Sequence, residues 1–338
     1  MHLSAGLLDL QVNGFAGVDF NAGTFGPKDI DHALEALLAT GVTHLLPTII
    51  TARPEDLAQR LKALDKAISA SRLGRLMCPG YHLEGPFLNP QDGFAGCHPA
   101  TAMGAASAEA IDRLEAPLDR PILLVTVAPE TEGGLDLIAA GARRGRIMAL
   151  GHTACDFDTA RAAADAGALL STHLGNGLPQ VLHKLANPIF AQLAEDRLWA
   201  SFIADGIHIH PQALKSLLRV KGLSRSILVT DAVTGAAAEP GRYDFAGMPI
   251  ERGVDGAVRQ LGGATLAGSA LCLDQAVRNL VAWGLASPRE ALTMAADNPR
   301  RLLAPALARF GLSIGTGRVV WNDALEVVEA TVSGSPEG

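Results

Sequence analysis

Glu130, His152 and His173 each close a short apolar run of the chain, in the segments ILLVTVAPE, RIMALGH and LLSTHLG. One carboxylate and two imidazoles form a three-ligand set that leaves a zinc-type ion an open coordination position for water. Each residue is expected at the C-terminal end of a buried strand, where a (β/α)₈ barrel keeps its chemistry. A fourth run, SILVTDA, brings Asp231 to the same edge as a candidate proton carrier. The pattern predicts a metal-dependent hydrolase.

The elements that must position these residues alternate along the chain. Runs rich in Val, Ile and Leu are separated by Ala-rich stretches of helical period. Strands are expected at 6–14, 43–50, 77–85, 122–130, 146–152, 169–175, 199–206 and 226–232, and helices at 27–41, 54–70, 107–116, 132–144, 157–166, 187–196 and 211–222. This alternation predicts a parallel (β/α)₈ barrel of the TIM type. A doubly wound open sheet has the same alternation, but no GxGxxG follows a strand here.

The pattern changes after the eighth expected strand. Residues 233–268 are rich in Gly, Ala and Pro, which indicates either a long active-site loop or a small β excursion. Two helices are expected at 269–283 and 287–303, and two strands between 317 and 333. We therefore expect a barrel over residues 5–306 and a reduced β extension over residues 307–338.

Composition excludes several classes of protein. Hydrophobic residues make up 48% of the 338, so a large core is available. A net charge of −7 and only 4% aromatic residues argue against a nucleic-acid partner. The four cysteines show no CxxC spacing, which favours free thiols in a reducing cytosol. Without a signal-peptide pattern or a long apolar stretch, we expect a cytoplasmic protein that does not enter a membrane.

Several motifs together carry a family resemblance. They are LLDLQVNGFAGVDF, LPTIIT, YHLEGPFLNP, VAPE, GHTA, THLGNG, FIADGIHIHP, LVTDA and LAGSALCLDQAVRN, which run from residue 6 to about residue 303. In this set and order, the chain resembles the N-acetylglucosamine-6-phosphate deacetylases of the amidohydrolase superfamily. The resemblance implies a (β/α)₈ barrel with a small β domain built from both termini. It also implies hydrolytic removal of an acetyl group from an amino sugar.

Carried over by position, the resemblance implies a role for each residue of the site. Glu130, His152 and His173 would hold one divalent ion, with zinc preferred over iron, cobalt or manganese. Asp231 would move the hydrolytic proton, first as general base and then as general acid. His98, in GCHP, would hydrogen-bond the acetyl carbonyl.

Other positions are implied to contact the sugar. Asn176 and the backbone of Gly177 match the loop that holds it, and His208, in DGIHIH, matches a contact near the phosphate end. His82 and Glu84, in YHLEGP, also lie at a strand end. We expect these two to support the site from outside the ligand set.

The chain departs from relatives at three places. Many amidohydrolases carry HxH at the end of the first strand for a second metal, whereas this chain has Gln11 and Asn13, which predicts one ion. A phosphate-binding Arg of the family is replaced in VLHKLANPIF by Lys184, with His183 beside it. We also expect the N-terminal segment that usually supplies half of the small β domain to be missing. The resemblance implies a homodimer in which this VLHKLANP loop completes the neighbour's phosphate site.

The substrate is left open among alternatives. Lys184 can hold a phosphate as a point charge but lacks the bidentate fork of Arg. An N-acetyl amino sugar phosphate therefore competes with an unphosphorylated or other small N-acyl compound. The alternative from another class is a catalytically silent sugar-binding barrel, against which the presence of Asp231 argues.

Overall fold

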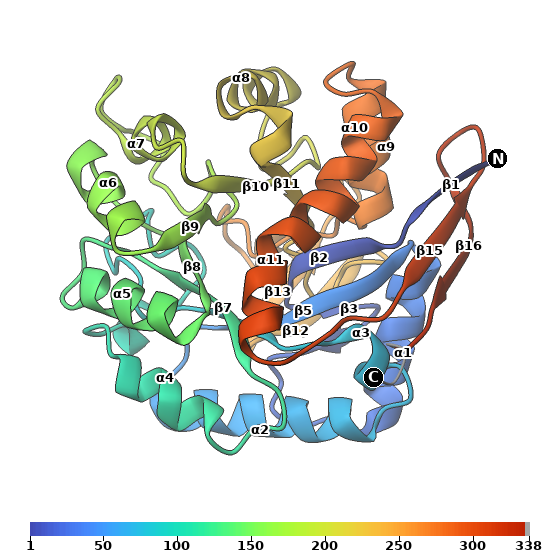
Figure 1. Cartoon of the computed structure of the whole chain (residues 1–338), viewed down its shortest axis with the longest axis horizontal. Coiled ribbons are helices and arrows are strands. Elements are labelled where there is room, and N and C mark those ends of the chain that lie inside the picture. The colour runs from blue at the N-terminus through green and yellow to red at the C-terminus, as the bar shows by residue number, and fades with distance from the viewer. Residues whose placement is uncertain (335–338) are drawn as a thin grey trace.

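Eight parallel strands form the centre of the computed structural model, which describes residues 1–334. They lie in the order β11-β10-β9-β8-β7-β6-β5-β2. Their bounds are β2 (Leu7–Val12), β5 (Val42–Ile50), β6 (Tyr81–Glu84), β7 (Ile122–Val127), β8 (Ile147–Leu150), β9 (Ala168–Ser171), β10 (Trp199–Ile203) and β11 (Ser226–Val229). A parallel bridge from Val12 to Ala232 brings the first and last strands together, so the sheet is nearly closed. The predicted (β/α)₈ barrel is confirmed (Figure 1).

Side-chain hydrogen bonds complete the seam between β2 and β11. Asp9 on β2 is fully buried, and its Oδ2 accepts a 2.6 Å hydrogen bond from the hydroxyl of Thr230. Its Oδ1 accepts backbone N–H groups of Gln11 and Thr230 at 3.2 and 3.3 Å. The backbone N–H of Asp231 donates to the carbonyl of Gln11 at 3.0 Å. The seam therefore ties the ends of two strands together directly beneath the residues predicted to do chemistry.

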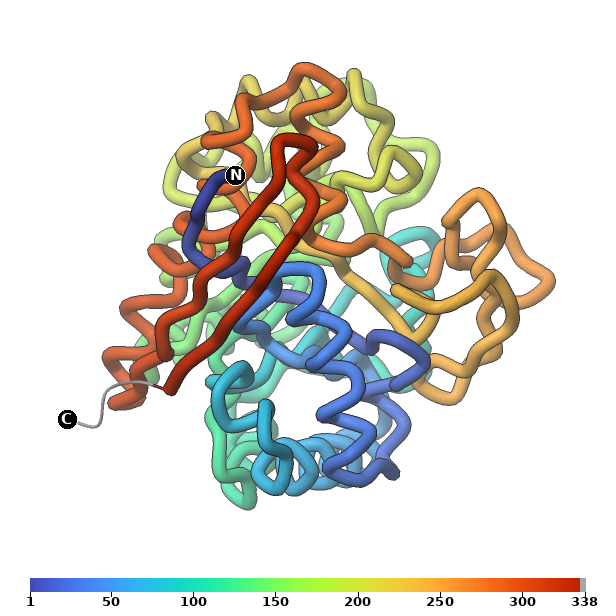
Figure 2. Tube along the Cα trace, turned by 90° about the vertical axis from the view of Figure 1, so that its right-hand side faces the viewer, coloured from blue at the N-terminus to red at the C-terminus, as the bar shows by residue number. Residues whose placement is uncertain are grey.

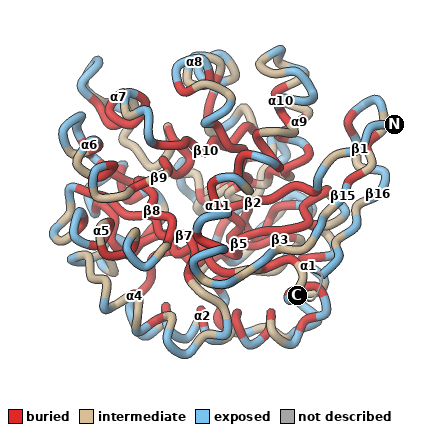
Figure 3. Tube along the Cα trace, in the orientation of Figure 1, coloured by how far each residue is buried: buried red, intermediate tan, exposed pale blue. Residues whose placement is uncertain are grey.

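Helices surround the strands as the apolar period predicts. They are α1 (Pro27–Ala39), α2 (Pro54–Ala70), α3 (Gly74–Met77), α4 (Ala108–Glu115), α5 (Gly134–Arg144), α6 (Phe157–Asp165), α7 (Pro188–Ala194), α8 (Pro211–Lys221), α9 (Leu273–Ala282), α10 (Pro288–Leu292) and α11 (Asn298–Arg309). In α1, buried Ile30, Ala33, Leu34 and Leu37 recur at helical spacing. The strands are buried and the outer helix faces are exposed, so the core lies inside and just outside the barrel (Figure 3).

A small antiparallel sheet lies outside the barrel, in the order β1-β15-β16. It combines β1 (His2–Ala5) with β15 (Gly317–Trp321) and β16 (Val327–Val332), so the N-terminus runs beside the C-terminal hairpin (Figure 2). Trp321 is fully buried and donates from Nε1 to the hydroxyl of Ser4 at 2.8 Å. The two strands expected between 317 and 333 are thus present, and β1 covers one edge of the pair. The division at residue 306 stays a prediction, and residues 335–338 of the predicted extension lie outside the described residues.

The segment after β11 forms a second antiparallel sheet, which decides between the two alternatives for residues 233–268. Its strands are β12 (Gly241–Phe245), β13 (Met248–Arg252) and β14 (Val258–Gln260). Phe245, Ile250 and Val258 pack with Ile50 and Val233 in a separate apolar cluster. The sheet projects as a distinct lobe in Figure 2.

No helix in the described part of the chain is long and apolar enough to span a bilayer.

Candidate metal and active site

A cavity of about 610 Å³ opens where the barrel strands end. Glu84 is the last residue of β6, and His152 and His173 each follow the end of their strand, β8 or β9, by two residues. Asp231 follows β11 in the same way. All of these side chains line the cavity, together with His98 from the long loop after β6. The C-terminal edge of the barrel therefore brings together groups that lie far apart in the sequence.

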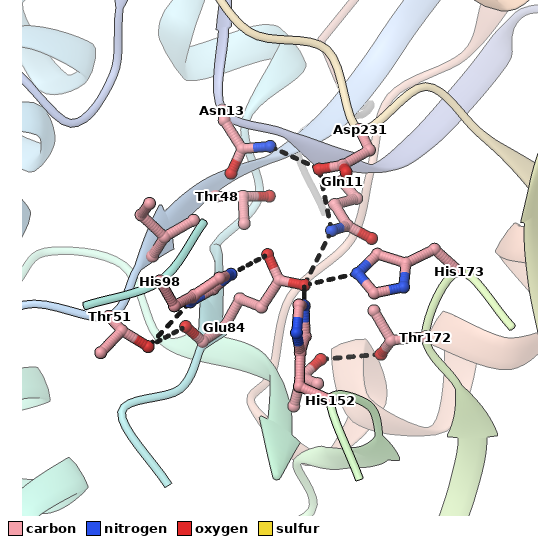
Figure 4. A network of polar contacts seen from close by, with 12 residues as sticks. Gln11, Asn13, Thr48, Thr51, Glu84, His98, His152, Thr172, His173 and Asp231 are labelled. Atoms are coloured by element: carbon pink, nitrogen blue, oxygen red, sulfur yellow. Dashed lines mark hydrogen bonds and ion pairs between the residues drawn. The ribbon is translucent and has the colours of Figure 1, made fainter. Parts of the chain in front are cut away.

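The centre of this site is the carboxylate of Glu84. Its Oε1 lies 2.8 Å from Nε2 of His173 and 3.4 Å from Nε2 of His152. Its Oε2 lies 3.8 Å from Nε2 of His98. Three imidazoles thus face one buried carboxylate (Figure 4). Ligating atoms of Glu84, His98 and His152 lie within 4.8 Å of one another, close enough to hold a metal ion.

Glu130 does not take the place expected for it. Its carboxylate is exposed and accepts hydrogen bonds from the Thr153 hydroxyl, from the backbone N–H of Ala154 at 2.6 Å and from Asn89 Nδ2 at 2.9 Å. The carboxylate that meets the two histidines is Glu84, which we expected only to support the site. Both carboxylates lie at the end of a predicted strand, and that shared signal explains why the sequence favoured Glu130. The motif YHLEGP contained the information, because it places Glu84 on the strand itself.

The imidazole of His152 is oriented by the backbone. Its Nδ1 lies 2.7 Å from the carbonyl oxygen of Phe94, an acceptor, so Nδ1 carries the proton and the Nε2 lone pair faces the cavity. Gly177 allows this ring to lie close to the sugar loop, because a Cβ there would lie 2.5 Å from Nδ1. The backbone φ of Gly177 is +62°, which also disfavours any other residue.

Three site residues other than glycine adopt left-handed backbone. His152 and Asp231 have φ of 51°, and His173 has φ of 30°. Such conformations cost about 1–3 kcal/mol each and persist where the surroundings over-determine them. Each turns the chain sharply just past its strand, which directs the side chain over the barrel mouth.

His98 and His82 are buried histidines with different surroundings. His98 Nδ1 lies 2.8 Å from the Thr51 hydroxyl, and burial together with the nearby His152 lowers the pKa of His98 to about 3. His82 Nε2 lies 2.8 Å from the Thr126 hydroxyl, and burial lowers its pKa to about 4. Both imidazoles are therefore neutral at physiological pH. His98 lines the cavity, whereas His82 is not among its lining residues.

Asp231 is held by amide donors where other amidohydrolases are expected to place metal-binding histidines. Its Oδ1 accepts hydrogen bonds from Asn13 Nδ2 at 2.7 Å and Gln11 Nε2 at 3.0 Å. Gln11 Nε2 also reaches Glu84 Oε1, at 3.1 Å. Burial and the negative charge of Glu84 raise the pKa of Asp231 to about 6. Asp231 can therefore both accept and return a proton near neutrality.

The predicted sugar-contacting residues divide into two groups. Asn176, Gly177 and His208 line the cavity. His183 and Lys184 are exposed and lie outside that lining, and His183 Nδ1 instead accepts the N–H of Ala186 at 3.0 Å.

The cavity lining among the described residues contains no Lys or Arg. His208 lines the cavity outside the cluster of histidines around Glu84. Its Nδ1 lies 2.6 Å from Asp205 Oδ2, and the other oxygen of Asp205 accepts the N–H groups of Ile207 and His208 at 2.8 Å each.

Comparison with known proteins supplies the family. No family model matches the chain. The N-acetylgalactosamine-6-phosphate deacetylase of Escherichia coli O157:H7 is 34% identical over 88% of this chain and 76% of its own length. The N-acetylglucosamine-6-phosphate deacetylase of Rattus norvegicus is 32% identical over 98% of this chain and 82% of its own length. The chain belongs to the N-acetylglucosamine-6-phosphate deacetylase family.

Solved structures of this deacetylase family agree with the fold. A mutant of the Mycobacterium smegmatis N-acetyl-D-glucosamine-6-phosphate deacetylase, in complex with N-acetyl-D-glucosamine-6-phosphate, gives a TM-score of 0.87 at 29% identity, covering 98% of this chain and 86% of that one. The Pasteurella multocida enzyme gives 0.85 at 27% identity, over 98% and 86% of the two chains. The predicted family and an amidohydrolase-type enzyme are thereby confirmed.

The residues of this deacetylase-family chain fit a divalent ion. Burial alone would raise the pKa of Glu84, but the imidazoles of His152, His173 and His98 around it hold that pKa well below its usual range. A buried ionised carboxylate is costly unless it is paired or bound to a metal. Nδ1 of buried His173 has no hydrogen-bond partner among the described residues, so only its Nε2 side is committed to Glu84. One carboxylate and two imidazoles make a possible metal site with room for water.

Proposed function

We propose that the chain hydrolyses the acetamide of an N-acetyl amino sugar 6-phosphate, using one divalent ion held by Glu84, His152 and His173. The observation that carries this proposal is the meeting of two imidazole Nε2 atoms on Oε1 of buried Glu84, with Asp231 at the same cavity wall. When bound, the ion lowers the pKa of water and polarises the amide carbonyl. A carboxylate and two imidazoles suit zinc best, with iron, cobalt and manganese as alternatives.

Asp231 would transfer the proton, and His98 would stabilise the charge that develops on the carbonyl oxygen. The Asp231 carboxylate accepts a proton from the attacking water and returns it to the leaving amine nitrogen. Its two amide donors, Gln11 and Asn13, fix it beside Glu84. Neutral His98 is held at the cavity wall by its Nδ1 contact with the Thr51 hydroxyl at 2.8 Å. In the tautomer that carries its proton on Nε2, this ring would donate to the carbonyl oxygen, where negative charge develops.

Binding of the sugar is supported by the loop after β9. Asn176 Nδ2 donates to the carbonyl of His173 at 3.0 Å, so the loop that borders the cavity is tied to a proposed ligand. His208, whose Nδ1 lies 2.6 Å from Asp205 Oδ2, supplies an imidazole nitrogen that can donate a hydrogen bond to a phosphate.

A homodimer would add to this binding site. Val181 and Leu185 are 87% and 67% exposed, in the same VLHKLANP loop as His183 and Lys184. Apolar side chains so exposed favour burial against a second copy. In that arrangement the loop would bring its cations to the neighbour's cavity.

One observation favours a second candidate, an unphosphorylated N-acyl sugar. The cavity lining among residues 1–334 offers no Lys or Arg to a phosphate dianion. Phosphate recognition by a single chain would then depend on His208 and on backbone donors.

Release of free amine from three substrates tests the proposal on metal-loaded protein. The substrates are N-acetylglucosamine 6-phosphate, N-acetylgalactosamine 6-phosphate and unphosphorylated N-acetylglucosamine, and the measure is kcat/KM. We expect the phosphorylated sugars to be preferred by about 10²-fold or more. Preference for the plain sugar would favour the second candidate. No amine release while metal is bound would contradict both.

A further inference from the structure

Glu130 joins two loops that carry the site. Two of its hydrogen bonds come from the loop after β8, from the Thr153 hydroxyl and the backbone N–H of Ala154. A third comes from Asn89, in the long loop after β6. Hydrogen bonds to an ionised carboxylate are about twice as strong as neutral ones. Although exposed, Glu130 therefore forms a substantial link between segments that are not neighbours in sequence.

The first loop fixes the backbone of His152. Thr153 and Ala154 directly follow it, and His152 has a φ of 51°. A left-handed histidine relaxes unless its neighbours hold it. The two bonds to Glu130 act on the next two residues, so they hold the turn that directs the imidazole toward Glu84.

The second loop fixes the far side of the same ring. The N–H of Asn89 donates to the carbonyl of His152 at 3.1 Å, and its Oδ1 accepts the N–H of Gln91 at 2.9 Å. The carbonyl of Gln91 then accepts the N–H of Phe94 at 3.1 Å. The carbonyl oxygen of Phe94 accepts a hydrogen bond from Nδ1 of His152 at 2.7 Å. A chain of hydrogen bonds thus runs from Asn89, which Glu130 holds, to the atom that sets the tautomer of His152.

We propose that Glu130 is a positioning residue that fixes the orientation and tautomer of His152 for metal binding. This inference rests on the proposed function, because it takes Glu84, His152 and His173 as the ligands. Loss of an outer hydrogen-bonding partner of a metal ligand typically costs 10–100-fold in metal affinity or activity.

The test compares Glu130→Ala with Glu132→Ala, which removes the same charge two residues further on the same exposed loop. Zinc affinity is measured by competition with a chromophoric chelator, and the coordination geometry by the visible spectrum of the cobalt-loaded protein. We expect Glu130→Ala to weaken zinc binding by about 10–100-fold and to change the cobalt spectrum. Glu132→Ala should match the wild type in both. Equal behaviour of the two variants would overturn the proposal.

A double-mutant cycle with Glu130→Ala and Thr153→Val tests whether Glu130 positions His152 through its hydrogen bond with Thr153. Thr153→Val removes one donor to Glu130 and leaves the carboxylate in place. Because both changes break the same link, their effects on zinc affinity should be less than multiplicative when combined. Fully multiplicative effects would count against the proposal. The thermal midpoint of apo Glu130→Ala should stay close to that of the wild type, because Glu130 lies at the surface.

Glu84→Ala serves as the reference that distinguishes this inference from the proposed function. It should abolish measurable zinc binding. If Glu84→Ala binds zinc like the wild type, the proposed ligand set fails. If Glu84→Ala loses zinc and Glu130→Ala does not, only the positioning role fails. A loss at Glu130→Ala as complete as at Glu84→Ala would instead make Glu130 a ligand.

Discussion

The Nε2 atom of Gln11 lies 3.1 Å from Oε1 of Glu84, the same oxygen that meets Nε2 of His173. That nitrogen also donates to Asp231 at 3.0 Å. An amide NH₂ group donates hydrogen bonds and has no lone pair for a cation, whereas an imidazole there would bind one. The position between Glu84 and Asp231 is therefore filled by a neutral donor that forms hydrogen bonds with both side chains.

We expect the wild-type chain to bind one divalent ion, and the double change Gln11→His with Asn13→His to raise this number toward two. Residues i and i+2 of a strand face the same side, so both new imidazoles would lie next to Asp231. Metal content per chain after dialysis, measured by atomic emission, checks the prediction. Two ions in the wild type would contradict it. The single change Asn13→Gln controls for disturbance of the strand, because it keeps an amide.

Replacement of Asp231 by Asn should remove the proton carrier but not the metal. General acid–base catalysis contributes about 10²–10⁴-fold, so kcat should fall by about that factor. Zinc content should stay at the wild-type value, because Glu84, His152 and His173 are intact. A catalytically silent sugar-binding barrel would instead show no turnover in either form and the same ligand affinity in both.

The pH dependence follows from the same carboxylate. Burial and the charge of Glu84 raise the pKa of Asp231 to about 6, and the general base is the deprotonated form. The kcat/KM should therefore rise with pH through a limb near or below 6, since a bound cation favours the carboxylate. That limb should be absent from the residual activity of Asp231→Asn.

The barrel could be predicted from the sequence because its signal is repeated eight times. Each strand is a short apolar run with a helix behind it, and the eight predicted strands differ from the observed ones only at their ends. The short helix α3 was not predicted, and the helix expected at 287–303 is divided into α10, a π-helical turn and α11. The edge strand β1 was not predicted, because His2–Ala5 is short and gains its partner only from residues at 318–321, over 300 positions away. Pairing at that separation leaves no local pattern.

The choice between Glu84 and Glu130 shows where sequence reasoning stopped. Both lie at the end of a predicted strand, but β6 ends at Glu84 itself, whereas β7 ends at Val127. Glu130 thus lies three residues past its strand, in a turn closed by the hydrogen bond from Thr131 N–H to the Ala128 carbonyl, and is not among the residues that line the cavity. An error of three residues in a predicted strand end is therefore enough to select Glu130, outside the cavity lining, instead of Glu84 at the centre of the site. His152 and His173 tolerate the same uncertainty, because each follows its strand by only two residues.

Asp205→Asn should weaken recognition of an anionic substrate more than that of a neutral one. The carboxylate of Asp205 lies 2.6 Å from Nδ1 of His208 and orients that imidazole, and the weaker hydrogen bond of an amide would hold it less firmly. We expect kcat/KM for the sugar 6-phosphates to fall by about tenfold, mainly through KM, with a smaller change for the unphosphorylated sugar. Parallel assays of both substrates, with zinc content as a control, give the measurement. An equal loss on both substrates would mean that the pair only orders the loop.

Buried Asp9 should make the stability of the barrel depend on pH. Burial raises the pKa of Asp9 to about 7, against a reference value of 3.8. Between these two pKa values the folded state keeps a proton on Asp9 that the unfolded chain has released. The contribution of this proton to the free energy of unfolding is therefore fully present below about pH 4 and is lost as pH rises toward 7. Relative to Asp9→Asn, which is neutral throughout, the wild type should lose on the order of 1 kcal/mol of unfolding free energy per pH unit.

Urea unfolding of the metal-free proteins at pH 4.5, 5.5 and 6.5 measures this difference. Asp136→Asn, at an exposed carboxylate on α5, is the control and should run parallel to the wild type. If the unfolding free energies of Asp9→Asn and the wild type changed equally with pH, Asp9 would be charged in the folded protein.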